Sequence, residues 1–288
     1  MNNKVLVLMP LLHESAYLEG AIASIRNQVG VQIIVVAQDN LSDDSTYSKF
    51  KELTYLDDRF HISRTGNRLS QSDNWNSLAD FALGMFDSDF VIWLGGDDIW
   101  EESTFLVKLI ERINNGAIAA CPIIRHSVIS EPCFPTNSYC VELESCEPDT
   151  RFRALLSNWR NVNAIHALYR REFFMKILNS NTGRPFNYLG FDWWWVLRAI
   201  QLGPIVNSYE STMDKRIKRI DQLKPSKALV RFLNRNLNDL LTFYSRTGYR
   251  SEIPLSWKLK IRTYFTYRIL RNLIGAPVKS RNYIISKL

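Results

Sequence analysis

The sequence predicts an α/β fold: a Rossmann-like, mostly parallel sheet flanked by helices, followed by a basic, mainly helical extension at the C-terminus. Three observations lead to this prediction. Continuously apolar runs alternate with helix-like stretches over about the first 120 residues, polar clusters follow three of those runs, and the sign of the charge changes near residue 212. Strands that are buried on both faces and separated by helices are typical of parallel sheets.

The predicted elements follow from the spacing of the apolar residues. Runs rich in β-branched and aliphatic residues predict strands, and apolar residues three or four positions apart predict helices. Residues 61–63 form too short a run to be assigned. In chain order the prediction is strand 5–9, loop 10–15, helix 17–28, strand 31–36, helix 45–53, helix 72–86 and strand 90–94.

The composition is that of a globular protein: of 288 residues, 46% are hydrophobic and 23% are charged. These values exclude a mainly disordered or collagen-like chain. No window reaches the roughly 18 uncharged apolar residues that a membrane span needs. The apolar start, residues 5–12, continues into His13 and Glu14 without a small-residue cleavage site. We therefore expect a buried strand, not a signal peptide, and a cytoplasmic chain.

The four cysteines, Cys121, Cys133, Cys140 and Cys146, have no C-x-x-C spacing, and His126 is the one histidine near any of them. We expect reduced thiols, as in most cytoplasmic proteins. A disulfide or a zinc site is the alternative.

Charge divides the chain into two predicted domains, 1–212 and 213–288. The first holds 18 basic and 25 acidic residues, whereas the second holds 18 basic and 4 acidic ones. From Ser256 to Leu288 there is no acidic residue, and aromatic residues lie among the basic ones. This mixture suits an anionic surface, either lipid headgroups or nucleic acid. The alternative is a solvated helical appendage packed on the first domain.

Polar clusters follow three of the predicted strands, at residues 11–14, 39–44 and 95–98. In an open parallel sheet the ligand crevice lies at the carboxyl ends of the strands. We therefore expect the three clusters to share one edge of the sheet, where packing alone would not require polar residues.

The third cluster, Gly95-Gly96-Asp97-Asp98, indicates a cation site. Two adjacent carboxylates at the end of a buried strand repel each other unless a cation or hydrogen-bond donors compensate them. Mg²⁺ and Mn²⁺ prefer such oxygen ligands together with substrate phosphates, and glycine lets a ligand approach the backbone. The alternative is that Asp98 caps a helix that includes residues 104–113.

In the second cluster, Asp39 directly follows a buried strand, so its carboxylate is able to accept a hydrogen bond from a nucleotide base or a ribose. Asp43 and Asp44 lie just before the predicted helix 45–53. We expect these two residues to act as helix caps, a role that Ser45 would also fill.

In their order and spacing over roughly residues 4–115, these blocks resemble a family 2 glycosyltransferase with the GT-A fold. A later segment is similar to the acceptor side of that family, and the resemblance fades after about Pro204. The residues that carry it are Val5–Glu14, Ser24–Gln28, Asp39–Thr46, Asn76, Gly95–Asp98, Tyr169–Phe173, Gly190–Arg198 and Gly203.

The resemblance implies an inverting, metal-dependent hexosyltransferase that takes a sugar from a nucleoside-diphosphate donor with the help of Mn²⁺ or Mg²⁺. It implies that Asp192 is the general base and that Asp98, with Asp97, holds the metal; Asp97 would also lie near the ribose. The other donor-binding positions are implied to be Asp39 at the base, Pro10, Leu11 and Leu12 in the base pocket, Glu14 in support of that loop, and Asn76.

The sequence departs from the family pattern at three positions. His13 replaces the usual asparagine, Leu41 replaces a common glycine, and Gly95 stands where many members carry the first aspartate of the metal motif. The last change removes one carboxylate from that motif. No histidine follows His166, so the late histidine ligand of some GT-A enzymes has no equivalent.

Apolar neighbours surround Asp192 in the sequence, because Phe191 precedes it and Trp193, Trp194 and Trp195 follow. Burial among them should raise the pKa and the basicity of Asp192. One tryptophan would line the acceptor cleft, with core packing as the alternative, and Asp192 would otherwise cap the helix 192–201. We expect His126 and His166 to be structural, and the basic cluster 215–219 either to close over the diphosphate or to begin the tail.

The expected function is that of a cytoplasmic enzyme, bound peripherally to the inner face of a membrane, in surface polysaccharide synthesis. Its partners would be a nucleotide-sugar donor, a saccharide or lipid-linked acceptor and an anionic membrane surface, with no nucleic acid. The alternative is a non-catalytic GT-A-like protein whose basic tail binds membrane or nucleic acid. A sugar nucleotidyltransferase and a dinucleotide oxidoreductase are disfavoured, because the sequence has no glycine-rich phosphate loop of either type.

Overall fold

The computed structural model describes residues 3–113, 116–128, 136–138, 140, 143–179, 191–217 and 256–257. The chain forms two units: Met1–Arg184 with Asp192–Lys218, and Pro185–Phe191 with Arg219–Leu288. Phe191 and residues 256–257 are the described part of the second unit, so the predicted helical extension lies almost wholly outside the described residues. The charge-based division at residue 212 falls within the last strand of the first unit, β9 (Ile205–Ile217).

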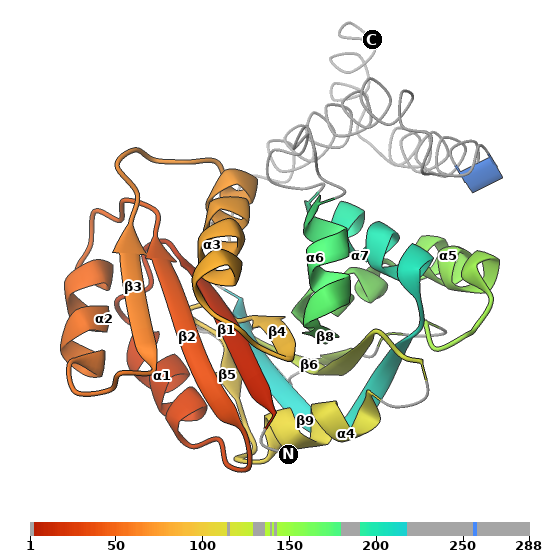
Figure 1. Ribbon diagram of the computed structural model, residues 1–288, viewed down its shortest axis with the longest axis horizontal. Helices are drawn as coiled ribbons and strands as arrows, with labels where there is room; N and C mark the ends of the chain where they lie inside the picture. The colour runs from red at the N-terminus through yellow and green to blue at the C-terminus, as the bar shows by residue number, and fades with distance from the viewer. Residues whose placement is uncertain are drawn as a thin grey trace, which may run out of the picture. The chain divides into compact units, whose positions relative to one another are not determined.

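Four parallel strands form the N-terminal half of the sheet, in the order β3–β2–β1–β4 (Figure 1). Every residue of β1 after Lys4 is buried, as a continuously apolar run predicts for a central strand that is covered on both faces. The three predicted strands are confirmed, and β3 is a further strand that the short run at residues 61–63 did not reveal. Their bounds are β1 Lys4–Leu11, β2 Gln32–Asp39, β3 Phe60–Arg64 and β4 Phe90–Trp93.

Helices α1 (Leu18–Arg26), α2 (Thr46–Thr54) and α3 (Gln71–Met85) connect these strands. Crossovers between parallel strands are right-handed. Helices α1 and α2, which lead from β1 to β2 and on to β3, therefore cover one face, and α3, which leads back to β4, covers the other (Figure 1). The three predicted helices are confirmed to within a few residues at their ends.

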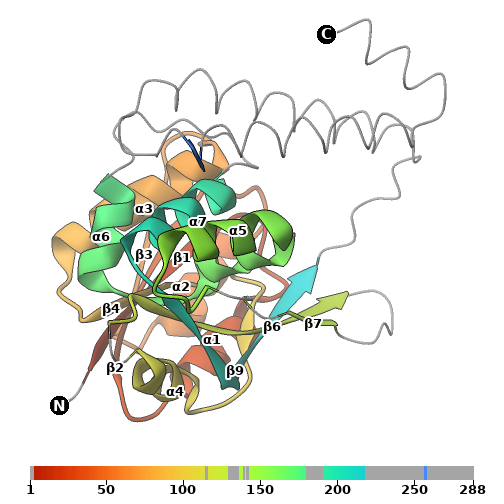
Figure 2. The same ribbon diagram turned by 90° about the vertical axis from the view of Figure 1, so that its right-hand side faces the viewer.

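The other half of the sheet is mixed. Within the described residues it continues as β4–β8–β6–β9–β5, with β7 paired to β6, and the pairs made by β5, β7 and β8 are antiparallel. Strands β6 and β9 run parallel side by side (Figure 2), and residues 209–211 are left out of their pairing. The strands are β5 Ile99–Trp100, β6 Ala119–Val128, β7 Thr136–Ser138 and β8 Leu168–Arg170. The helices are α4 Phe105–Arg112, α5 Pro148–Ser157, the 3₁₀ helix η1 Trp159–His166, α6 Arg171–Asn179 and α7 Phe191–Leu202.

A cluster of buried aromatic rings holds α7 against the sheet. The ring centroid of Trp93 on β4 lies 5.5 Å from that of Phe174 on α6 and 6.0 Å from that of Trp195 on α7. Tyr169 on β8 lies 5.9 Å from Trp195. Such pairs contribute about 0.5–1.5 kcal/mol each beyond the burial of their surface. Trp194 and Trp195 are buried, which supports core packing for these two of the three consecutive tryptophans.

Three of the four cysteines lie in the described residues. Cys121, Cys140 and Cys146 are free thiols, and the sulfur atoms of Cys121 and Cys140 lie 3.0 Å apart as a hydrogen-bonded pair. Cys133 lies outside the described residues. No helix of the described ranges is both long enough and apolar enough to cross a membrane.

Candidate functional site

The ends of β1, β2 and β4 meet at one edge of the sheet. Leu11 pairs in register with Asp39, and the backbone N–H of Asn40 donates to the carbonyl of Leu11 at 3.0 Å. Gly96, after β4, packs on the same loop: a Cβ at this position would lie 2.7 Å from Leu11 Cδ2 and 2.9 Å from Glu14 Cβ. The three polar clusters therefore lie together, and the close approach of Gly96 is one that a side chain would prevent.

The residues that the family resemblance placed in a base pocket come from the end of β1. Pro10 and Leu11 are buried and Leu12 is half-buried. Glu14 is buried, and its backbone N–H donates to Thr46 Oγ1 at 2.8 Å. The backbone of Glu14 thus ties this loop to the start of α2, and the supporting role expected for the Glu14 side chain is still a prediction.

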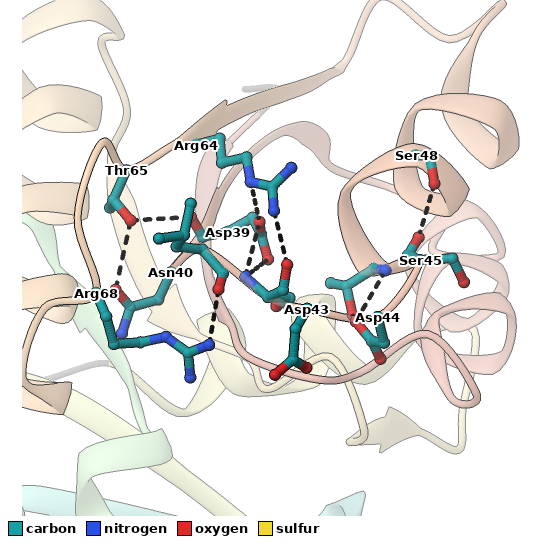
Figure 3. A network of polar contacts seen from close by, with 12 residues as sticks. Asp39, Asn40, Asp43, Asp44, Ser45, Ser48, Arg64, Thr65 and Arg68 are labelled. Atoms are coloured by element: carbon teal, nitrogen blue, oxygen red, sulfur yellow. Dashed lines mark hydrogen bonds and ion pairs between the residues drawn. The ribbon is translucent and has the colours of Figure 1, made fainter.

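Asp39 is fully buried at the end of β2 and has an ion-pair partner that the sequence did not predict. Arg64 Nε, at the end of β3, lies 3.0 Å from Asp39 Oδ2 (Figure 3). The backbone N–H of Ser42 donates to both carboxylate oxygens of Asp39, at 3.3 and 3.2 Å. Arg64 Nη2 in turn donates to the carbonyl of Ser42 at 2.6 Å. A guanidinium group therefore stands beside the carboxylate expected to meet a nucleotide base.

Two of the three departures from the family pattern have a left-handed backbone. The φ angle is 58° at His13 and 53° at Leu41. Asparagine and glycine, which the family commonly carries there, reach this region more readily than other residues. His13 Nδ1 lies 2.9 Å from Asp43 Oδ1, and Arg68 Nη2 donates to the carbonyl of Leu41 at 2.7 Å. Asp43 thus pairs with His13 and does not act as the predicted cap of α2.

Asp44 does fasten the start of α2. Its Oδ1 accepts from the backbone N–H of Thr46 at 3.0 Å, and its Oδ2 accepts from Ser15 Oγ at 2.8 Å. Although partial burial opposes the change, the hydrogen bonds from Thr46 and Ser15 lower the pKa of Asp44 to about 2. Ser45, the other predicted cap, makes no capping hydrogen bond with its side chain.

Gly95–Asp98 forms a tight turn between β4 and β5. The backbone N–H of Asp98 donates to the carbonyl of Gly95 at 3.2 Å, and the N–H of Gly95 donates to Asp98 Oδ2, also at 3.2 Å. A Cβ at Gly95 would lie 2.9 Å from both Asp97 Oδ1 and Asp98 Oδ2. Because β5 follows this turn and α4 is preceded by Thr104, the alternative that Asp98 caps the helix of residues 104–113 is wrong.

Asp98 is buried and Asp97 is half-buried. Burial is the main cause that raises the pKa of Asp98 to about 7, and the neighbouring carboxylates of Asp97 and Asp214 act in the same direction. The ammonium group of Lys215 and the N–H of Gly95 oppose this change. The ionised form of Asp98 is therefore unfavourable unless a cation compensates its charge.

Asp192 lies in the first turn of α7, and its side chain is half-buried. Burial raises the pKa of Asp192, and the ammonium group of Lys215 opposes this shift. The apolar neighbours in the sequence predicted the same direction. Since α7 already includes Phe191, Asp192 lies inside the helix and not at the capping position before it.

Lys215 lies beside the Asp98 turn, and its charge also opposes the rise in the pKa of Asp192. In the antiparallel pair of β5 with β9, Ile99 lies opposite Asp214, so Asp98 and Lys215 are the next positions on the two strands. Lys215 Nζ donates to His166 Nε2 at 2.5 Å. The sequence showed Lys215 as one member of the basic cluster 215–219. The next member, Arg216, points to the opposite face from Lys215, because successive strand residues alternate in direction. Its guanidinium group lies over the ring of Tyr17.

His166 is buried at the end of η1. Burial holds its pKa well below the usual value, and the nearby charge of Lys215 lowers it further. His166 is therefore neutral and able to accept the hydrogen bond of the ammonium group. His126 pairs in register with Lys215 across β6 and β9. Both histidines were expected to be structural, and the described contacts of His166 agree with a hydrogen-bonded structural role.

Asn76 is buried on α3, and its Oδ1 accepts no hydrogen bond within the described residues. The same helix is tied to the end of β2, because Gln38 Nε2 donates to Asn74 Oδ1 at 2.9 Å. The structure therefore brings α3 to this edge of the sheet, and the expected role of Asn76 in donor binding is still a prediction.

The oxygen atoms of Asp98 and Asp97 fit a Mg²⁺ or Mn²⁺ ion. In the described part of the chain, no group of three or more His, Cys, Asp or Glu side chains is placed to hold a metal. These two ions are commonly bound by one or two carboxylates together with waters and substrate phosphates. The residues present thus match an ion that is completed by substrate, and not one that is enclosed by protein.

Residues 6–178 match the protein family described as glycosyl transferase family 2. No curated protein matches the chain in sequence. Similar solved structures include the mannosyltransferase PcManGT from Pyrobaculum calidifontis in complex with GDP-Man and Mn²⁺. Its sequence is 13% identical and its TM-score is 0.57, and the match covers 100% of this chain and 80% of that one.

The structure of S. aureus TarS is also similar, with a TM-score of 0.53 and 14% identity over 96% of this chain and 50% of TarS. The TarS 1–349 structure in complex with UDP has a TM-score of 0.51 and 14% identity, over 96% of this chain and 85% of that one. At these low sequence identities, the structural similarity shows a shared fold. The predicted mixed α/β fold of the GT-A type is confirmed.

Proposed function

Because the chain belongs to glycosyl transferase family 2, we propose that it is an inverting glycosyltransferase that moves a sugar from a nucleoside-diphosphate donor to a lipid-linked saccharide. The observation that carries the proposal is the meeting of three strand ends, where Asp39, the Asp98 turn and the Leu11 loop lie side by side. The charge of Lys215 affects the pKa of both Asp98 and Asp192, which supports a place for Asp192 near the same site.

The donor would lie along this edge of the sheet. Asp39 would meet the nucleotide base, with Pro10, Leu11 and Leu12 beside it, and the diphosphate would reach the Asp98 turn. The similar structures support a nucleotide-sugar donor, since PcManGT is in complex with GDP-Man and TarS 1–349 with UDP-GlcNAc.

In the proposed reaction the acceptor hydroxyl oxygen forms a bond to the anomeric carbon as the bond from that carbon to the diphosphate oxygen breaks. Asp192 takes the hydroxyl proton, and the nucleoside diphosphate leaves with the bonding electrons. A Mn²⁺ or Mg²⁺ ion held by Asp98 and Asp97 would supply positive charge to the diphosphate as it leaves. Burial raises the pKa of Asp192, which makes it a stronger base than an exposed aspartate.

The first experiment is a thermal-shift screen of the full chain with UDP, GDP, dTDP and CMP, with and without Mn²⁺. The nucleotide that stabilises the protein identifies the donor class, and its sugar conjugates are then tested for slow release of nucleoside diphosphate. We expect Asp98→Ala to abolish this release. Asp89→Ala is the matched control, because Asp89 precedes β4 at the opposite end of the same strand. No release from any conjugate would favour a non-catalytic protein.

We also propose that the enzyme is cytoplasmic, acts in surface polysaccharide synthesis and lies at the inner face of a membrane, held by its basic, aromatic tail. Each Lys or Arg near an anionic membrane surface contributes about 1 kcal/mol of attraction. Replacing Lys258, Lys260, Arg262, Arg268 and Arg271 by Gln in the full chain should release it from anionic vesicles in sedimentation. Equal sedimentation of the variant would contradict the membrane role, and binding of RNA by the unaltered chain would point to the other anionic partner.

A further inference from the structure

We propose that Lys215 is a donor-binding residue whose ammonium group faces the diphosphate and supports nucleotide binding even when no divalent cation is present. This inference rests on the proposed function and adds a permanent positive charge to the same site. A metal ion bound by the carboxylates of this region would be exchangeable. The charge of Lys215 is not, because Lys215 is part of strand β9.

The pairing of the strands fixes the position of Lys215. Ile99 of β5 lies opposite Asp214 of β9. The next positions along the two strands are Asp98, at the end of the Gly95–Asp98 turn, and Lys215, so these two residues lie side by side. On its other side β9 pairs with β6, where Lys215 is in register with His126. The ammonium group therefore enters the site from a paired strand, whose position two neighbouring strands fix.

The side chain is also held at its tip. Nζ donates to His166 Nε2 at 2.5 Å, and His166 itself is buried. An ammonium group has three N–H donors. Among the described residues, His166 accepts the one hydrogen bond that Lys215 donates, which leaves the other two N–H groups for a ligand.

The charges around Lys215 explain why a diphosphate needs it. Asp98 and Asp97 lie at the turn, Asp214 is the neighbouring residue on β9, and Asp192 lies within the electrostatic range of the ammonium group. A diphosphate that approaches these carboxyl groups is repelled unless cations compensate their charge. The charge of Lys215 affects the pKa of both Asp98 and Asp192, so its ammonium group lies near the Asp98 turn and near the proposed base, where we propose that the diphosphate binds.

A purely structural role for Lys215 predicts a different effect of its removal on nucleotide affinity. If Lys215 served only to offset the buried carboxylates, its removal would lower stability and leave the affinity of the folded protein for nucleotide unchanged. If it contacts the diphosphate, removal weakens binding most strongly when no metal can substitute for it.

The test is isothermal titration calorimetry of the full chain with UDP, GDP and dTDP, in excess EDTA and separately with Mn²⁺. We expect the wild type to bind one of these nucleotides in EDTA, more weakly than with Mn²⁺. Lys215→Met should lose at least about 10-fold in affinity in EDTA, with a smaller loss in Mn²⁺. Lys215→Arg, which keeps the charge, should retain most of the EDTA binding. Lys108→Met is the matched control. Lys108 lies on α4 and donates to the backbone carbonyl of Glu210, so this variant should bind nucleotide as the wild type does.

Two results would overturn the inference while the proposed function stands: binding by the wild type that requires Mn²⁺, or equal affinity of the wild type and Lys215→Met in EDTA. If Lys215→Met does not fold, the wild type and Lys215→Arg still test the inference. Binding in EDTA that Lys215→Arg retains would show that a positive charge at this position is sufficient. Failure of the wild type to bind any of the three nucleotides, with Mn²⁺ or without it, would overturn the proposed function together with this inference.

Discussion

The guanidinium group of Arg64 lies 3.0 Å from the fully buried carboxylate of Asp39. It joins the end of β3 to the end of β2 at the place where a nucleotide base is proposed to bind. Removing one partner of a buried pair leaves an uncompensated charge, which is costly. The Arg64 side chain is itself 40% exposed, so part of this cost is relieved by water.

Arg64→Met should therefore lower the free energy of unfolding by about 2 kcal/mol and weaken nucleotide binding. Urea denaturation and calorimetry measure the two effects. Arg59→Met is the control, because Arg59 has similar exposure and pairs with Asp57 at 2.8 Å. It should cost stability without changing nucleotide affinity. Unchanged affinity in Arg64→Met would remove Arg64 from the binding site.

Leu41→Gly should stabilise the protein. Leu41 has a φ of 53°, and a left-handed backbone costs a residue with a side chain about 1 kcal/mol. Leu41 is 36% exposed, so the loss of its buried apolar surface offsets part of this gain. We expect the free energy of unfolding to rise by about 0.5–1 kcal/mol. Leu56→Gly is the matched control: Leu56 is 92% exposed and has no positive φ, so the change should destabilise.

Gly95→Ala should disturb both carboxylates of the turn. The added Cβ would lie 2.9 Å from Asp97 Oδ1 and from Asp98 Oδ2, closer than such contacts normally are. The carboxylates must rotate away, so Mn²⁺-dependent nucleotide affinity should fall by about 10-fold or more. Gly84→Ala on α3, where a Cβ meets no atom within 4 Å, should bind as the wild type does. Equal binding by both variants would show that the turn does not hold the metal.

Asp192→Asn should remove proton transfer and leave the donor site intact. We expect kcat to fall by about 10²–10⁴-fold with little change in nucleotide affinity. Asp149→Asn, at the equivalent first turn of α5, should have full activity. Because the pKa of Asp192 is raised by burial, the acid limb of the wild-type pH profile should lie above the usual aspartate range, with activity lost as pH falls through it. A profile without such a limb would argue against this base.

Asp44→Asn should weaken the start of α2 in a pH-dependent way. The pKa of Asp44 is lowered to about 2 from 3.8, so its ionised form stabilises the folded state above about pH 4 and this contribution disappears as pH falls toward 2. Because Asp44 is exposed and solvent screens it, we expect a loss of about 1 kcal/mol at pH 7. Urea denaturation of both proteins at pH 7 and at pH 2 measures it, and a difference that persists at pH 2 would contradict this cause.

The parallel half of the fold could be predicted because its strands are long, continuously apolar and separated by helices. Strands β5 and β8 could not, since two or three residues carry no periodicity. Their assignment depends on pairing with strands far away in the chain. The run at residues 61–63 is too short to be assigned for the same reason, so the sequence does not indicate a site role for Arg64 at the end of β3.

The carboxylates of the site could be predicted, because they directly follow apolar runs and the order of the strands brings them to one edge. Lys215 and His166 could not be placed in the same way. Their contact depends on the register of β9 with β5 and β6 and on the position of η1, none of which leaves a signal in the sequence near Lys215. The positive φ at His13 and Leu41 likewise follows from loop packing that the local sequence does not indicate.

The aromatic cluster has a consequence for the timing of assembly. Trp93 ends the strand that leads into the Asp98 turn, and Trp195 lies one turn after Asp192 on α7; their rings are both fully buried and 6.0 Å apart. Separating the turn from the helix would require opening the hydrophobic interior. The spacing between Asp98, the proposed metal ligand, and Asp192, the proposed base, is thus set when the chain folds, so substrate would meet a preorganised pair of groups.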